Sequence, residues 1–301
     1  MTTPTPPPAM ALIICDVFEP ELALVMPGAS HVIEQRLFEI GLHDRPEIMR
    51  VELQKGIDAL GEREDIEVIA LVYGLCGCGT VGLHSARQRL VIPRAHDCRT
   101  VFLGSKELFA SREQACPGCY YYTPGWNRAR RVPGPEREAS LKESYGKQFD
   151  PEDVEFLLES EREMWASYNT TAFIDHGTAD SAREAAYTKE CAEWLGWRYE
   201  YVRGDPTLLH DLVWGPWDAD RFQLIEPGQQ LAHALRILLA ALPAVFFQQG
   251  LLALEGAGQA FFIAVDLRFA QAVFNLAELG LQPGQARVAR QGQRQGGLVG
   301  R

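Results

Sequence analysis

The sequence predicts an α/β fold: a mostly parallel, Rossmann-like sheet with helices on both faces, followed by a helical or disordered C-terminal extension. Residues 67–73 (EVIALVY) are apolar in consecutive positions, which is typical of a strand covered by helices on both sides. Short apolar segments alternate with helical patterns as far as residue 228, as in parallel α/β sheets. Beyond about residue 229 the chain is rich in Ala, Leu and Phe and contains no further strong strand pattern.

Three short apolar segments in the first part of the chain are predicted to be neighbouring parallel strands. They lie at residues 11–14, 67–73 and 90–93. Residues 31–60 have apolar side chains at helical spacing, which predicts a helix between the first two strands. The glycine-rich segment 74–82 is predicted to be a turn that opens a helix. A further helix is expected at about residues 100–113.

The same alternation continues in the second part of the chain. Residues 116–135 contain several Pro and Gly residues beside aromatic ones, so a structured loop is expected there. Residues 151–168 are predicted to be an acidic amphipathic helix, with Asp150 as its N-cap and a proline in its first turn. Further helices are expected at residues 181–195 and 207–214, and further strands at residues 171–174, 198–202 and 222–225.

These patterns divide the chain into four segments. Residues 1–10 are expected to be a disordered lead-in and residues 11–228 the α/β domain. Residues 229–283 are apolar with helical spacing, and residues 284–301 form a Gly-, Gln- and Arg-rich tail that is expected to be disordered.

Charge and cysteine content restrict the classes of function. A net charge of −11 argues against nucleic acid or an anionic membrane surface as the main partner. No apolar segment reaches the roughly 18–20 residues of a membrane span, and the N-terminus lacks the pattern of a signal peptide. A cytoplasmic location is therefore expected, where thiols stay reduced. The seven cysteines are accordingly interpreted as core residues, metal ligands or nucleophiles.

Four potential metal ligands follow the first three predicted strands. Cys15 ends the first, Cys76 follows the second, and His96 and Cys98 follow the third. Ligands of open parallel sheets bind at the carboxyl ends of the strands, so these side chains are expected to meet in one crevice. Three thiolates and an imidazole suit Zn²⁺ or an iron–sulfur cluster. The alternative is that the cysteines fill core space as small hydrophobic residues.

The glycines Gly74, Gly77 and Gly79 follow the second predicted strand. They match neither the phosphate-binding Walker pattern nor the dinucleotide fingerprint. Two interpretations remain open: a close approach of the backbone to a bound cofactor, or a tight turn between strand and helix. The aromatic residues Tyr122 and Trp126 are further candidates for contact with a cofactor.

For the other residues that could carry chemistry, a structural role is favoured over a functional one. Cys116 and Cys119 form a CxxC motif, but it follows a predicted helix and offers only half of a zinc site. His176 ends a predicted strand and either lines the same crevice or packs in the core. Glu19 and Glu21 follow Cys15 and are candidate acids for proton transfer, although exposed carboxylates are the favoured interpretation.

Several strings in this order resemble the bacterial and archaeal family called domain of unknown function 1638. The resemblance covers about residues 11–230 and is carried by CDVFEPEL at 15–22, YGLCGCGTVGL at 73–83, VIPRAHDC at 91–98, FLGSKE at 102–107, YYYTPGW at 120–126, FIDHG at 173–177 and LIEPG at 224–228. It implies no established activity, although members are often found beside corrinoid-dependent methyltransferase systems.

The resemblance also separates the cysteines into two groups. Cys15, Cys76, His96 and Cys98 match the family pattern. Cys78 more usually corresponds to asparagine, and the CxxC cysteines at 116 and 119 replace other residue types. The predicted site is thereby reduced to three thiols and one imidazole.

The leading hypothesis is a metal- or cofactor-binding protein of one-carbon or corrinoid-linked methyl-transfer metabolism. Zn²⁺ held by Cys15, Cys76 and Cys98, with His96 as fourth ligand or base, would lower the pKa of a substrate thiol or bound water. One alternative is a metal-free enzyme with a cysteine nucleophile, such as Cys98, and His96 as its base. Another is a non-catalytic protein that docks a corrinoid or methyltransferase partner through residues 120–126 and the apolar C-terminal region. The oligomeric state is not predicted.

Overall fold

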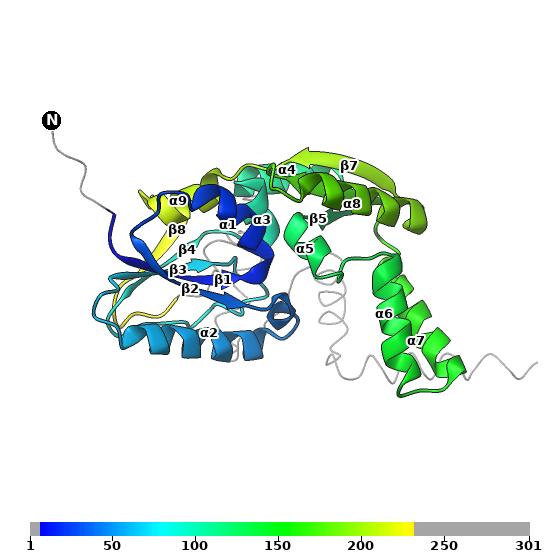
Figure 1. Ribbon diagram of the computed structural model, residues 1–301, viewed down its shortest axis with the longest axis horizontal. Coiled ribbons are helices and arrows are strands. Elements are labelled where there is room, and N and C mark those ends of the chain that lie inside the picture. The colour runs from blue at the N-terminus through cyan, green and yellow to red at the C-terminus, as the bar shows by residue number, and fades with distance from the viewer. Residues whose placement is uncertain (1–6, 232–301) are drawn as a thin grey trace, which may run out of the picture. The chain divides into compact units, whose positions relative to one another are not determined.

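Continuous apolar sequence forms the centre of a five-stranded sheet in the computed structural model, which describes residues 7–231 (Figure 1). The strand order is β2-β1-β3-β4-β8. β1 (Met10–Cys15) and β3 (Val68–Val72) are buried along their whole length, and both pair in parallel with their neighbours. β4 (Arg89–Pro93) is parallel to β3, whereas the edge strand β8 (Phe222–Ile225) is antiparallel to β4. The predicted mixed α/β fold with a mostly parallel sheet is thus confirmed.

Helices cover this sheet on opposite sides, which explains why its central strands are apolar in consecutive positions. α2 (Pro46–Gly61) contacts β1, and α9 (Thr207–Trp214) contacts β3 and β4. Figure 1 shows α2 on one side of the sheet and α9 with α1 (Glu19–Val25) on the other. The short helix α1 follows the 3₁₀ turn η1 (Asp16–Phe18) and was not predicted.

The prediction of a helix over residues 31–60 is wrong in its first part. β2 (Val32–Phe38) is an edge strand, followed by a 3₁₀ turn, η2 (Ile40–Asp44), and only then by α2. The half-buried positions of β2 include Glu34 and Arg36, whereas Leu37 is exposed. Glu34 is compensated by an ion pair with Arg63. Polar residues therefore lie on the more buried face of β2 and apolar residues on the exposed face. The sequence for this reason lacks the usual alternation of a strand, with apolar residues on the buried face.

A second, three-stranded parallel sheet has the order β5-β6-β7. β6 (Thr170–Asp175) and β7 (Arg198–Arg203) lie where strands were predicted, and α8 (Ser181–Leu195) packs on both. β5 (Cys119–Tyr122) and α5 (Pro124–Arg128) replace the predicted loop at residues 116–135. The loop prediction is wrong because the four residues of β5 are stabilised by pairing with β6, about fifty residues later.

The remaining helices differ from the predictions mainly in length. The single helix expected at residues 100–113 is divided into α3 (Cys98–Leu103) and α4 (Lys106–Ala115), with Gly104 in a left-handed conformation between them. α7 (Pro151–Met164) begins as predicted, because the Asp150 side chain accepts hydrogen bonds from two backbone N–H groups of its first turn. α7 packs against α6 (Pro135–Gly146), which was not predicted.

Most of the predicted terminal segments lie outside the described residues. The expected lead-in at residues 1–10 extends into β1, which begins at Met10. The extension expected at residues 229–283 lies almost wholly outside the described residues, and the tail at 284–301 does so entirely. Within residues 7–231, no helix is long and apolar enough to cross a membrane.

Candidate functional site

A pocket of about 460 Å³ is formed by segments that follow or belong to strands of both sheets. Cys15, the last residue of β1, lines it together with Cys76, His96 and Cys98 from the segments after β3 and β4. The second sheet contributes β5, including Cys119. Side chains that are far apart in the sequence therefore share one pocket.

The surroundings of two thiols of this pocket, Cys15 and Cys98, favour the protonated form. Cys15 is 8 % exposed, and burial, followed by the neighbouring Cys76 and Asp16, raises its pKa to about 12. The neighbouring Cys76, burial and the nearby negative groups raise the pKa of Cys98 well above its ordinary value. Cys76 contributes to raising the pKa of both thiols, and a cation is the group that would reverse this effect.

His96 is oriented by the residue that follows it. Asp97 caps the N-terminus of α3, and its Oδ2 lies 3.1 Å from Nδ1 of His96 and 2.6 Å from a guanidinium nitrogen of Arg99. Burial opposes ionisation of Asp97, but hydrogen bonds from His96 and Arg99 hold its pKa well below the usual range. A carboxylate on Nδ1 leaves Nε2 of a half-exposed imidazole as the atom that can bind a metal or accept a proton.

The glycine-rich segment 74–82 is a series of turns and opens no helix, so that part of the prediction is wrong. Left-handed backbone angles occur at Cys76, Gly77 and Cys78. Gly74 packs against the backbone of Asp97, where an added Cβ would lie 2.6 Å from its Cα. Of the three glycines proposed to approach a cofactor, Gly77 lines the pocket, whereas Gly74 and Gly79 pack against protein atoms and are not among its lining residues.

The two aromatic residues proposed to contact a cofactor have different positions. Trp126 lines the pocket. Tyr122 is fully buried and not among the lining residues, and its hydroxyl donates a hydrogen bond to the carbonyl of Pro133 at 2.7 Å. Tyr122 is therefore a core residue whose polar atom is satisfied within the protein.

Sequence analysis missed several residues of this pocket. Tyr73 ends the EVIALVY segment and lies close enough to Cys15 to affect its pKa. Arg99 directly follows Cys98, and its guanidinium lies 5.8 Å from the centre of the Tyr121 ring. The rule that ligands bind beyond strand ends would have found Tyr73 and Arg99, but Tyr121 belongs to the strand that was not predicted.

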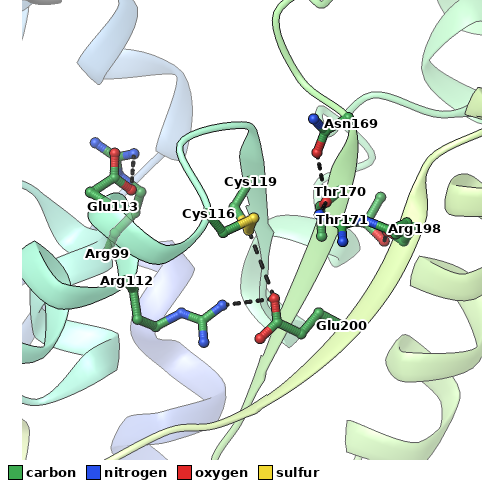
Figure 2. Close-up of a disulfide and its surroundings, with 10 residues drawn as sticks. All are labelled: Arg99, Arg112, Glu113, Cys116, Cys119, Asn169, Thr170, Thr171, Arg198 and Glu200. Atoms are coloured by element: carbon green, nitrogen blue, oxygen red, sulfur yellow. Dashed lines mark hydrogen bonds and ion pairs between the residues drawn. A yellow bond between two sulfur atoms is a disulfide. The ribbon is translucent and has the colours of Figure 1, made fainter.

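A different set of side chains is closest to the spacing of a metal centre. Among the described residues, only Cys116, Cys119 and Glu200 offer three ligand atoms that all lie within 4.8 Å of one another. The sulfurs of Cys15, Cys76 and Cys98 do not meet this distance together. Cys116 and Cys119 form a disulfide (Figure 2), which the expectation of reduced thiols did not include.

The candidate proton-transfer groups lie elsewhere. His176 is buried and not among the lining residues; its Nε2 lies 2.8 Å from the carbonyl oxygen of Phe102, and its Nδ1 lies 3.7 Å from Glu21. Glu21 is fully buried, so the expectation of an exposed carboxylate is wrong for this residue, and burial raises its pKa. Glu19 is exposed and forms an ion pair with Arg128.

Comparison with known proteins supports the resemblance seen in the sequence. Residues 37–213, more than half of the chain, match the family described as Protein of unknown function (DUF1638). No curated protein and no solved structure shows a significant match. The chain therefore belongs to the DUF1638 family.

Proposed function

We propose that this protein binds one Zn²⁺ ion through the thiolates of Cys15, Cys76 and Cys98, with His96 as the fourth ligand or as a nearby base. The ion would activate a thiol or water for a group-transfer reaction, and the family resemblance favours one-carbon or corrinoid-linked methyl transfer. The observation that carries the proposal is the convergence of three thiols and one carboxylate-bound imidazole in a single pocket.

Electrostatics support a cation at this position. The pKa of Cys15 and of Cys98 is raised, in part because negative charge on a neighbouring sulfur opposes their ionisation. Arg99 does not compensate them, since its guanidinium is paired with Asp97. Zn²⁺ would stabilise all three thiolates at once and release their protons to solvent.

The arrangement around His96 also fits a zinc ligand. Imidazole ligands commonly donate their second N–H to a carboxylate, which fixes the tautomer and raises the basicity of the ligating nitrogen. Asp97 is placed to accept this hydrogen bond. Zinc ligation requires the sulfurs to lie about 3.8 Å apart, as tetrahedral Zn–S bonds of about 2.3 Å demand. Side-chain rotation of the three cysteines would have to supply this closure.

The walls of the pocket indicate the kind of substrate that it could hold. Trp126, Trp165 and Tyr168 provide apolar surface, and Arg131 and Arg137 lie among them. Both arginines are paired with carboxylates, Arg131 with Asp44 and Arg137 with a glutamate of α7. The pocket thus favours a substrate with a substantial apolar part.

Metal analysis tests the proposal. The full chain, purified without chelator in a Cys116→Ser/Cys119→Ser background, is expected to contain about one zinc per chain. Cys98→Ser should lower the zinc affinity by more than the 10–100-fold typical of losing an outer-shell partner. Cys78→Ser is the matched control. Cys78 lies in the same turn as Cys76 but is not among the residues that line the pocket. Zinc content unaffected by Cys98→Ser would refute the proposal. Iron and acid-labile sulfide found in place of zinc would show that the site holds an iron–sulfur cluster instead.

The other two hypotheses have less support. A cysteine nucleophile needs a thiolate at neutral pH, and the raised pKa values of Cys15 and Cys98 oppose this in the metal-free protein. Docking of a corrinoid partner was assigned to residues 120–126 and the apolar C-terminal region. Tyr122 is buried in that first segment, and most of the second lies outside the described residues.

A further inference from the structure

A second cluster of potential metal ligands lies on the three-stranded sheet (Figure 2). Cys116 follows the last residue of α4 and Cys119 is the first residue of β5. Glu200 on β7 reaches towards them, with an oxygen 3.9 Å from the sulfur of Cys119. The Cα atoms of the two cysteines are 5.5 Å apart. A CxxC pair with one carboxylate is a donor set that suits zinc when the thiols are reduced.

The turn that carries the two sulfurs is held by groups outside the cluster. The backbone N–H of Cys119 donates to the carbonyl of Cys116 at 3.1 Å. The carbonyl of Gly118 accepts hydrogen bonds from the N–H groups of Asn169 and Thr170. None of these bonds involves a sulfur atom, so none is lost when the disulfide is reduced. The backbone that presents the two cysteines is therefore pre-organised for ligand binding in either state.

Charge balance favours an alternation between a disulfide and a metal-bound dithiolate. Arg112 lies 3.0 Å from Glu200, and its side chain is largely buried. In the disulfide form this guanidinium and the carboxylate neutralise each other. With two thiolates and Zn²⁺ added, the two new negative charges are balanced by the two positive charges of the ion. A dithiolate without the metal would leave both negative charges uncompensated.

We propose that Cys116, Cys119 and Glu200 form a redox-gated Zn²⁺ site, which binds zinc as a dithiol and loses it as a disulfide. The site uses none of the ligands proposed for the other zinc centre, Cys15, Cys76 and Cys98, although Cys119 lines the same pocket. A dithiol reductant supplies two electrons and two protons: its thiols become a disulfide, and the Cys116–Cys119 bond becomes two thiols. Zn²⁺ then displaces the two protons into solvent, with Glu200 as third ligand and a water in the fourth position.

Zinc titration against a chromophoric chelator tests this site in the full chain. After reduction with a phosphine, the chain should bind one zinc more than the Cys116→Ser/Cys119→Ser variant, and oxidation with diamide should remove this difference. The same comparison in a Cys98→Ser background separates this site from the other one. If the first proposed centre does not exist, the redox-dependent zinc binding should be the same with and without Cys98→Ser.

Glu200→Gln provides the second measurement. Loss of a direct ligand should weaken the redox-dependent binding by at least about tenfold, since outer-shell partners alone account for 10–100-fold. Glu113→Gln is the matched control, because Glu113 lies on α4 and pairs with Arg99 instead. Replacing zinc with Co²⁺ should give a thiolate-to-cobalt absorption band that is absent from the double serine variant. Equal zinc binding by the reduced, oxidised and double serine proteins would overturn the proposal, as would equal effects of the two glutamine variants.

Discussion

The two sheets present their cysteines in different chemical settings. In the five-stranded sheet, Cys15, Cys76 and Cys98 come from three separate strand ends and meet in a pocket. Each arginine among its described lining residues is paired with a carboxylate. In the three-stranded sheet, Cys116 and Cys119 come from one turn and lie beside an existing pair of opposite charges, Arg112 and Glu200. The comparison teaches that clustered cysteines with neither a compensating charge nor a disulfide favour the protonated thiol. Among the described residues the first group has neither, which supports the metal proposed for it.

The largest expected effect is on the alkylation rate of Cys15 in the first group of cysteines. With the pKa of Cys15 raised to about 12, its thiolate fraction near pH 8 should be about a thousandfold below that of a thiol with its ordinary value of 9.0. Alkylation of the metal-free protein, followed by mass spectrometry, should modify Cys15 more slowly than it does in the denatured chain by at least this factor. The rate should rise with pH up to about 12. Rapid labelling of Cys15 near pH 8 would contradict the buried, uncompensated state.

Disrupting the contact between α5 and η1 should have the next largest effect, on the free energy of unfolding. An added Cβ at Gly125 in α5 would collide with the backbone carbonyl of Val17 in η1, which cannot move without disturbing the end of β1. Gly125→Ala should therefore destabilise the protein by about 3 kcal/mol, at the upper end of the range for overpacking. Urea unfolding measures this. Gly146→Ala, which has no neighbour within 4 Å of its added Cβ, should be neutral or slightly stabilising.

A change at Asp97 should weaken the first site selectively. Asp97→Asn removes the carboxylate that orients His96, so zinc affinity should fall 10–100-fold, or about 1.4–2.7 kcal/mol. The redox-dependent zinc of the three-stranded sheet should be unchanged. Asp65→Asn, which affects an exposed carboxylate paired with Arg63, is the control. Equal zinc affinity in the two variants would show that Asp97 does not act through a metal ligand.

The smallest effect concerns the buried pair between the sheets, Glu21 and His176. Burial raises the pKa of Glu21, with the nearby His176 opposing this shift. The folded state therefore favours the protonated carboxyl. Its stabilising contribution is complete below the ordinary Glu pKa and is lost as pH rises through the raised value. Glu21→Gln stays neutral, so its stability relative to the native chain should increase with pH over this range. Unfolding curves measured across pH would show a constant difference if Glu21 did not titrate.

Much of the first site could be predicted from the sequence because its strands are buried on both faces. Such strands are continuous apolar segments, and their ends are visible as the positions where Cys15, Cys76 and His96 appear. Helices between them imply parallel strands, so these ends share one edge of the sheet. The edge strand β2 was missed because Glu34 and Arg36 occupy its more buried positions. Pairing with β1 stabilises β2 as a strand, although its own sequence pattern does not predict one.

The sequence by itself determined the α/β class, the central strands and the segments whose side chains share the main pocket. Only the tertiary structure decided the second sheet, because β5 is too short to be recognised without its pairing to β6. It also decided which aromatic residue faces the pocket: Trp126 lines it, whereas Tyr122 is buried in the core. Glu200 meets Cys119 across 81 positions of the sequence, through a strand that lies between theirs. The physical reason is that local hydrophobic pattern reports burial, whereas the partners of polar and sulfur atoms depend on strand order in space.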